Sequence, residues 1–377
     1  MFSQAFAITR NTFFESIRQP IVFVLLVIGG LLIIASGPLS AFTMEEDQRM
    51  LVDISLASVF LTGTLLSAFI ATSVLGREIE SGTALTVVSK PISRPLFVIG
   101  KFLGVAGALI ITTILLGLIF MLMEIYGTHQ TVRHPVHEPV LFFGLGAGVI
   151  GLLTALWCNY FYGMVFTSTA VCVTTPLLIL AYVLCLNFDH DFSSQQMSTD
   201  FNASLWVALF GVIAAILVLS AIAIAISTRL GQLLTIALTI GIFMTGMLSD
   251  WAFGRHIDSI KTVWLDRAAA EGNTTEEVTI RTIEWATGEI DQVEHVTEVA
   301  TVPLTTYATY SEQIELGVTW VAYAVIPNFQ IMWLADALTQ GRMIPGSYLV
   351  RILIYSAFYI IAALGVATIL FQRREVS

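Results

Sequence analysis

The residues of this chain that could act together are charged side chains gathered in one short stretch. REIESGTALTVVSKPISRPLFVIGK, residues 77–101, holds two glutamates, two arginines and two lysines, although only 12% of the chain is charged and 56% is hydrophobic. A soluble domain carries about 25% charged residues. The stretch contains no phosphate-binding loop, because VIGKF lacks the upstream glycine and the hydroxyl residue of GxxxxGK[ST]. Its charges therefore indicate recognition of another surface rather than nucleotide chemistry.

The elements that must position this stretch are expected to be membrane-spanning helices. About 20 mostly apolar residues cross a bilayer core roughly 30 Å thick. Hydrocarbon offers the backbone no hydrogen bonds, and the alternating pattern of a transmembrane barrel does not appear. We expect an all-α polytopic membrane protein with about eight spans, near 20–37, 52–75, 97–123, 140–158, 164–187, 203–226, 231–250 and 348–371.

The N-terminal segment before Pro20 is expected to form an amphipathic interfacial helix rather than a cleaved signal. Its apolar residues fall on or near one face, and its arginines suit lipid headgroups. These residues are Phe2, Phe6, Phe13 and Ile17, with Arg10 and Arg18.

The distribution of basic residues predicts which side of the membrane each loop faces. Nine of the 17 Lys and Arg residues fall in segments on the side of the N-terminus: Arg10, Arg18, Arg77, Lys90, Arg94, Lys101, Arg229, Arg373 and Arg374. The short loops on the other side hold only Arg49 and Arg133. By the positive-inside rule we expect a multi-pass protein of the cell membrane, the inner membrane in bacteria, with both termini cytoplasmic.

Two further regions follow an expected membrane domain of residues 1–250. Residues 251–317 change to a Thr, Glu and Val composition with partly alternating runs, which predicts an extracytoplasmic insert containing a few strands. Residues 318–377 begin with a long apolar segment, 318–338, that is interrupted by Pro327, Asn328, Gln330 and Asp336. We expect this segment to be interfacial or re-entrant and to precede the last transmembrane helix.

On this topology the charged stretch contains a cytoplasmic loop, 76–96, between the second and third spans. Glu78 and Glu80 would open a short helix with an apolar stripe, and Pro91 and Pro95 would end it. Lipid anchoring explains the basic residues Lys90, Arg94 and Lys101, which would meet the headgroups, but it leaves the glutamates unexplained. A short helix that docks into a groove of a cytoplasmic partner explains both.

REIESGTALTVVSKPISRPLFVIGK resembles the coupling region of permease subunits in the type-two ABC transporter family, especially the branch grouped with copper-enzyme maturation permeases. The N-terminal helix and the segments PNFQIMWLADAL and FQRREV are similar to that branch as well. The resemblance implies a permease driven by a separate cytoplasmic ABC ATPase subunit, paired with a second permease copy or homologue, and working as an exporter. By position, the coupling residues would be Glu78, Glu80, Ser81, Gly82, Thr83, Lys90, Pro91 and Arg94. Family members commonly have six spans, so eight spans leave the cargo open.

We expect no enzyme activity and no cofactor of the chain's own, with ATP bound by the partner subunit. GxSxG and HExxH motifs are absent, as is CxxC spacing among the three cysteines. The net charge of −10 lies on the expected outer face, so it gives no reason to expect a nucleic-acid partner. The lipid bilayer is the other expected partner.

One outer loop holds residues that could bind copper or zinc. THQTVRHPVHEP supplies His129, His134, His137 and Glu138, but their spacing is irregular and a solvated loop is the preferred interpretation. We therefore predict no metal site.

Two other functions stay open. The chain could be a membrane anchor or sensor that acts through the insert, with the helices as a scaffold, or a passive channel or carrier. The middle of every expected span lacks Asp, Glu, Lys, Arg and His, which disfavours a proton-coupled carrier.

Overall fold

The computed structural model describes residues 2–40, 47–80, 93–127, 136–284 and 288–372. Within these ranges, seven helices are long and apolar enough to cross a membrane. The protein is an all-α polytopic membrane protein, as its composition predicted, with one small two-stranded sheet. The chain divides into two compact units, residues 1–240 with 345–377, and residues 241–344.

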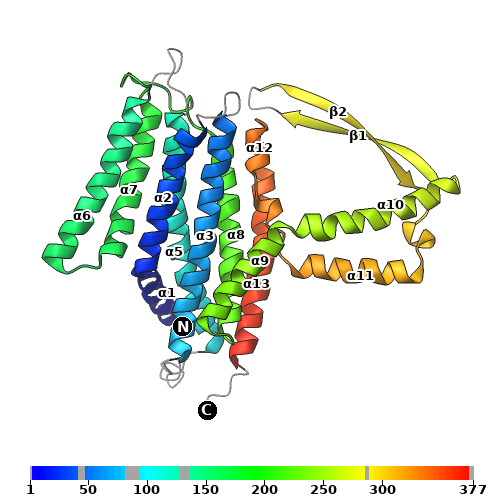
Figure 1. Cartoon of the computed structure of the whole chain (residues 1–377), viewed down its shortest axis with the longest axis horizontal. Helices are drawn as coiled ribbons and strands as arrows, with labels where there is room; N and C mark the ends of the chain where they lie inside the picture. Colours follow the sequence, from blue (N-terminus) through cyan, green and yellow to red (C-terminus); the bar gives the residue numbers. More distant parts are fainter. Residues whose placement is uncertain (1, 41–46, 81–92, 128–135, 285–287, 373–377) are drawn as a thin grey trace. The chain divides into compact units, whose positions relative to one another are not determined.

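The first unit contains the short helix α1 and the seven candidate spans (Figure 1). Helix α1 covers Phe2–Ile17, and the π-helical turn η1, Val140–Leu145, precedes α6. The spans are α2 (Pro20–Ser40), α3 (Asp47–Glu80), α5 (Arg94–Tyr126), α6 (Gly146–Tyr162, continuous with η1), α7 (Phe166–Asn187), α8 (Ala203–Ser227) and α13 (Gly346–Gln372). All seven coincide with expected spans.

Helices α3, α5 and α8 form the core of this unit. They are buried over most of their length and contact one another, whereas α6 and α13 expose most of their surface. Lipid tails are as apolar as leucine, so close packing and hydrogen bonds hold such helices together. Ser36 of α2 and Ser55 of α3 hydrogen-bond across two helices, with 2.8 Å between their hydroxyl oxygens.

The expected span 231–250 is not one straight helix. Helix α9 covers Gln232–Met247, and its 16 residues reach only about 24 Å. It passes the test for a span only together with Asp250–Ala270, from which it is bent by 53°. A π-helical turn, η2 (Asp250–Gly254), forms the start of that continuation, and π turns inside helices are frequent at such bends.

The second unit contains two helices that flank a β-hairpin. Helix α10 covers Arg255–Ala270, β1 Thr274–Glu284, β2 Ile290–Ala300, and α11 Tyr310–Val325, with a 3₁₀ turn, η3 (Leu304–Tyr307), before α11. The strands are antiparallel, with Thr274 opposite Ala300 and Glu284 opposite Ile290. The sequence predicted strands here but not α10. The helical segment expected from residue 318 begins earlier, at Tyr310, so the expected border at residue 317 falls inside α11.

One side-chain cluster fixes α11 to α10. Both guanidinium nitrogens of Arg267 bind the Glu312 carboxylate, at 2.9 and 2.8 Å, and the indole nitrogen of buried Trp264 donates to the same group at 3.0 Å. The Arg267 guanidinium lowers the pKa of Glu312 from its ordinary 4.5 to about 2. This charge density does not suit hydrocarbon, so we place these two helices outside the seven spans.

The apolar segment 318–338 is broken where its sequence indicated. Helix α11 ends at Val325, before Pro327, and the chain continues as η4 (Gln330–Met332) and α12 (Ala335–Thr339) with a bend of 49°. The Asn328 side-chain oxygen accepts hydrogen bonds from the backbone nitrogens of Gln330 and Ile331, which stabilises the turn.

Candidate functional site at the start of helix α5

The charged stretch begins in the last described turn of α3 and ends in the first turns of α5. Glu78 and Glu80 belong to α3, so they extend a membrane helix instead of opening the short helix that we expected there. Arg94 is the first residue of α5. The remaining predicted coupling residues, Ser81, Gly82, Thr83, Lys90 and Pro91, lie outside the described residues.

Arg94 ties the start of α5 to the end of α13. Its Nη1 donates a hydrogen bond of 2.8 Å to the backbone oxygen of Gln372. A cation suits this place because the carbonyl end of a helix carries a partial negative charge. Phe97, one turn further on, stacks on Phe371 with ring centroids 5.8 Å apart. Arg94 therefore binds a neighbouring helix end, in addition to lying near the expected headgroup level.

Lys101 is buried, which corrects the expectation that it meets the headgroups. Only 3% of the residue is exposed, and its Nζ lies 3.5 Å from the Glu15 carboxylate of α1 and 5.7 Å from the centre of the Phe97 ring. A charge inside a membrane domain requires such a partner. The Lys101–Glu15 pair thus connects α5 to α1 electrostatically.

Helices α1 and α5 approach each other closely because α5 presents glycines to α1. A Cβ on Gly104 would lie 2.5 Å from Cβ of Thr12 and 2.7 Å from the backbone oxygen of Thr9. A Cβ on Gly100 would lie 2.9 Å from Cγ2 of Ile8, and the Thr9 hydroxyl donates to the Gly100 backbone oxygen at 3.3 Å. Gly100 and Gly104, four residues apart on one face of α5, thus allow the close packing of the two helices.

The packing face of α1 differs from its expected apolar face. Thr12, Ser16 and Ile17 are buried, whereas Phe6 is 68% exposed. Hydroxyl side chains of α1 fit against glycines of α5, and the Phe13 ring lies against Gly107 of the same helix. The expected apolar face is therefore divided: Phe13 and Ile17 pack inside the unit, and Phe6 lies on the outer surface.

The connection from α1 to α2 is also bound to α3, because the side-chain nitrogen of Gln19, just after α1, donates to the Ser73 hydroxyl. The two helices that enter and leave the charged loop are thus both held by the N-terminal segment. We call this set of contacts the α5 clamp: Arg94, Phe97, Gly100, Lys101 and Gly104 of α5, with Thr9, Thr12, Glu15, Gln19, Ser73, Phe371 and Gln372.

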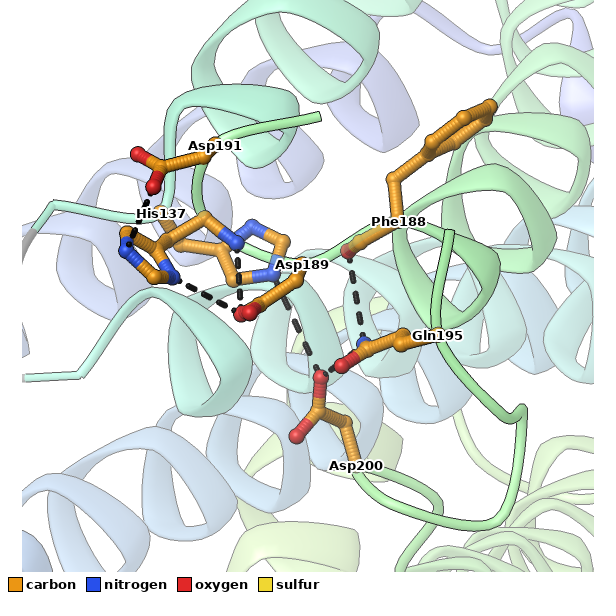
Figure 2. A network of polar contacts seen from close by, with 7 residues as sticks. His137, Phe188, Asp189, Asp191, Gln195 and Asp200 are labelled. Carbon is orange, nitrogen blue, oxygen red and sulfur yellow. Dashed lines mark hydrogen bonds and ion pairs between the residues drawn. The ribbon is translucent and has the colours of Figure 1, made fainter. Parts of the chain in front are cut away.

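The other end of the first unit carries a second polar group, shown in Figure 2 and called the loop cluster here: His137, Asp189, His190, Asp191, Gln195 and Asp200. Gln195 bridges it by donating to the Asp200 carboxylate and to the Phe188 backbone oxygen at 3.3 Å (Figure 2). The residues come from the segment before η1 and from the connection between α7 and α8.

His137 is the buried member of the loop cluster. Neither ring nitrogen makes a well-formed hydrogen bond within the described residues. The ring faces the Phe188 backbone and the Asp200 carboxylate, whose Oδ2 lies 4.0 Å from Nε2. Burial lowers the pKa of His137 below its ordinary value, and the Asp200 carboxylate opposes this only in part.

His190 is the solvent-facing member. Its Nδ1 lies 2.9 Å from the Asp189 carboxylate and its Nε2 3.1 Å from that of Asp191. The bond to Asp189 raises the pKa of His190, and His190 in turn lowers the pKa of Asp189. The nearby residue Phe192 has a left-handed φ of 58° and packs against Phe142, Phe143 and Phe188, which holds this strained turn.

The loop cluster gives no metal site in the described part of the chain. No group of three or more His, Cys, Asp or Glu residues is arranged there to hold a metal ion. His129 and His134 lie outside the described residues, so only His137 of the three predicted candidates can be placed.

Sequence reasoning missed the partners of the α5 clamp. Glu15 is the only acid of α1, and a lysine one turn inside a span signals that a carboxylate must lie nearby, so this pair could have been sought. No signal in the sequence identifies the Gln372 carbonyl as the acceptor of Arg94.

Comparison with known proteins gives no relative from which a function could be transferred: no protein-family model and no curated protein matches the chain.

Proposed function

We propose that the chain is the transmembrane permease subunit of an ATP-binding-cassette transporter, driven by a separate cytoplasmic ATPase subunit. The observation that carries this proposal is the α5 clamp. The charged loop lies between α3 and α5, and the first three turns of α5 hold α1 and α13 by packing, an ion pair and a capping arginine.

A displacement applied to this loop would move several helices together. Well-packed helices shift as units because their interfaces do not deform continuously. Helices α3 and α5 belong to the buried core, so motion at their ends reaches the centre of the first unit. A loop that served only as a lipid anchor would need no such connection.

Further parts of the proposal rest on the sequence. The cytoplasmic side of the loop and of both termini follows from the positive-inside rule, and the missing phosphate-binding loop is the reason to expect no nucleotide bound by this chain. The sequence resemblance supplies the rest: Glu78, Glu80 and Arg94 lie at the ATPase contact, two permease subunits assemble with two ATPases, and transport is directed outward.

Copurification and ATP hydrolysis test this function. The solubilised full chain is isolated from its native membrane and tested for an associated ATPase, and Glu78→Lys/Glu80→Lys is compared with wild type. We expect the variant to express normally and to lose most transport-linked ATP hydrolysis. A matched control, Glu277→Lys/Glu289→Lys, makes the same charge change in the β-hairpin and should retain hydrolysis. Absence of any ATPase from the wild-type preparation would refute the proposal.

A second candidate is a membrane anchor or sensor that acts through the second unit. It is favoured by one observation, the β-hairpin whose residues are almost all exposed. Under this alternative the hairpin control would lose function while the Glu78/Glu80 variant would retain it.

A further inference from the structure

The β-hairpin is held at both ends but covered on neither face. At its base, the Asn273 side chain donates to the Tyr307 hydroxyl at 2.7 Å, and the Thr301 backbone nitrogen donates to the Asn273 oxygen at 2.9 Å. At its far end, the Met343 backbone nitrogen donates to the Glu284 oxygen at 3.1 Å. Every residue of β2 except Ala300 is exposed. An isolated two-stranded sheet is at best marginally stable in water.

The two faces of the hairpin differ in charge. Successive side chains alternate between faces, and paired residues share one. Glu276 lies opposite Glu298, Val278 opposite Val296, and Ile280 opposite Glu294. We call the face that carries these six residues the acidic face. It holds no lysine or arginine, whereas the other face carries His295.

The acidic face combines exposed apolar area with uncompensated negative charge. Val278, Ile280 and Val296 are 54%, 56% and 58% exposed and form one strip. Glu276 and Glu298 face each other directly, and like charges at such a pair destabilise a sheet. A cation placed between these two carboxylates would relieve that repulsion, and an apolar side chain over the strip would bury it.

We propose that the acidic face is a docking surface for a cationic amphipathic segment of another protein. A helix with an apolar stripe flanked by Lys or Arg matches it, because a helix packs on a sheet face through apolar side chains while its flanking cations reach the glutamates. This docking surface is independent of the transporter function proposed above.

Charge argues against the other occupants of this face. Between residues 274 and 300, carboxylates outnumber the single arginine seven to one, so a second copy of the hairpin would be repelled. Anionic lipid headgroups would be repelled for the same reason. A cationic amphipathic protein segment would bury the apolar strip and pair with the carboxylates.

The test measures binding of a fluorescent 18-residue Leu/Lys amphipathic helix to the full chain in phosphatidylcholine nanodiscs, with empty nanodiscs subtracted. Glu276→Gln/Glu298→Gln removes two charges from the acidic face. Glu277→Gln/Glu289→Gln removes two charges from the other face and the turn, and serves as the matched control. We expect the first pair to weaken binding roughly fivefold or more and the control less than twofold, with the difference shrinking at high salt.

A second variant tests the apolar strip with all charges kept. Val278→Ser/Val296→Ser should also weaken binding of the Leu/Lys peptide, while a Leu/Glu peptide of the same length should not bind. Hydrogen exchange of the hairpin amides checks that each variant keeps its sheet.

Several results would overturn the docking surface. The first is an equal loss of Leu/Lys peptide binding in the two Glu→Gln double variants. The second is no binding of that peptide to the wild-type chain above empty nanodiscs. The third is binding of the Leu/Glu peptide as strong as that of the Leu/Lys peptide. Concentration-dependent dimers that are lost in Val278→Ser/Val296→Ser would assign the face to a second copy. Hairpin-dependent binding of empty anionic vesicles would assign it to lipid.

Discussion

The two ends of helix α5 handle charge in opposite ways. At its start, Lys101 is buried against Glu15 and Arg94 caps the end of α13, so each cation is matched to an acceptor on a neighbouring helix. Near its other end, the loop cluster gathers carboxylates around His137, a buried ring without a well-formed hydrogen bond in the described residues. Helix α5 runs about 50 Å between them.

The start of α5 is a structural connection between helices, whereas the loop cluster contains groups that can gain or lose a proton. Charges matched across closely packed helices hold those helices in one arrangement. A buried imidazole beside a carboxylate changes its interaction energy when it gains a proton. The contacts at the start of α5 therefore hold neighbouring helices together, whereas the interactions within the loop cluster depend on the protonation of its histidines.

Gly104→Ala should give the largest effect at the α5 clamp. The new Cβ would meet Thr12 and the backbone oxygen of Thr9, so α1 has to move. We expect a loss of about 1–3 kcal/mol in the free energy of unfolding, measured by denaturant titration in detergent. Gly148→Ala on α6 is the matched control, because nothing lies within 4 Å of its Cβ, and it should be neutral or slightly stabilising. Equal stability of the two variants would contradict the close α1–α5 packing.

The Lys101–Glu15 pair should respond unequally to loss of either partner. Glu15→Gln weakens the compensation of a lysine that is 3% exposed, and we expect a loss of about 1–2 kcal/mol in unfolding free energy. Lys101→Met leaves only a carboxylate with a side chain 38% exposed, so its loss should be smaller. The same denaturant titrations compare them, and the reverse order would show that Lys101 is not the buried member.

The two histidines of the loop cluster should contribute to folding stability with opposite dependences on pH. The pKa of His137 is lowered in the folded chain, so its contribution to stability is present above its ordinary 6.5 and is lost as the pH falls from there through the folded pKa. The pKa of His190 is raised, so its contribution is present below 6.5 and is lost as the pH rises through its folded pKa.

Melting temperatures between pH 5 and 8 check this pair. Compared with wild type, His137→Gln should lose less stability on acidification, and His190→Gln should lose more. Changes of the same sign in both variants would contradict the arrangement of the loop cluster.

Arg94→Ala should have the smallest effect on stability and the most informative effect on function. Its hydrogen bond to the Gln372 carbonyl is partly exposed, so we expect a loss of only about 0.3–1 kcal/mol in unfolding free energy. If the clamp transmits force, ATP hydrolysis by the associated ATPase should nevertheless lose its dependence on transport. An ATPase assay with the variant that matches wild type would limit Arg94 to a capping role.

Much of the fold could be predicted from residues close together in the sequence. Apolar length identified all seven single-helix candidate spans, Pro327 marked the break after α11, and alternating residues around 274–300 indicated strands. The exceptions are local as well. A π-helical turn bends the expected span 231–250, and Glu78 and Glu80 continue α3 because nothing before them stops the helix.

The sequence by itself determined that this is a polytopic membrane protein and where its seven single candidate spans lie, because a span requires about 20 mostly apolar residues. Only the tertiary structure decided that Lys101 is buried against Glu15, 86 residues away, and that Arg94 binds a carbonyl 278 residues away. The physical reason is that a buried charge is stabilised by a compensating group close to it in space, and helix packing decides which group that is.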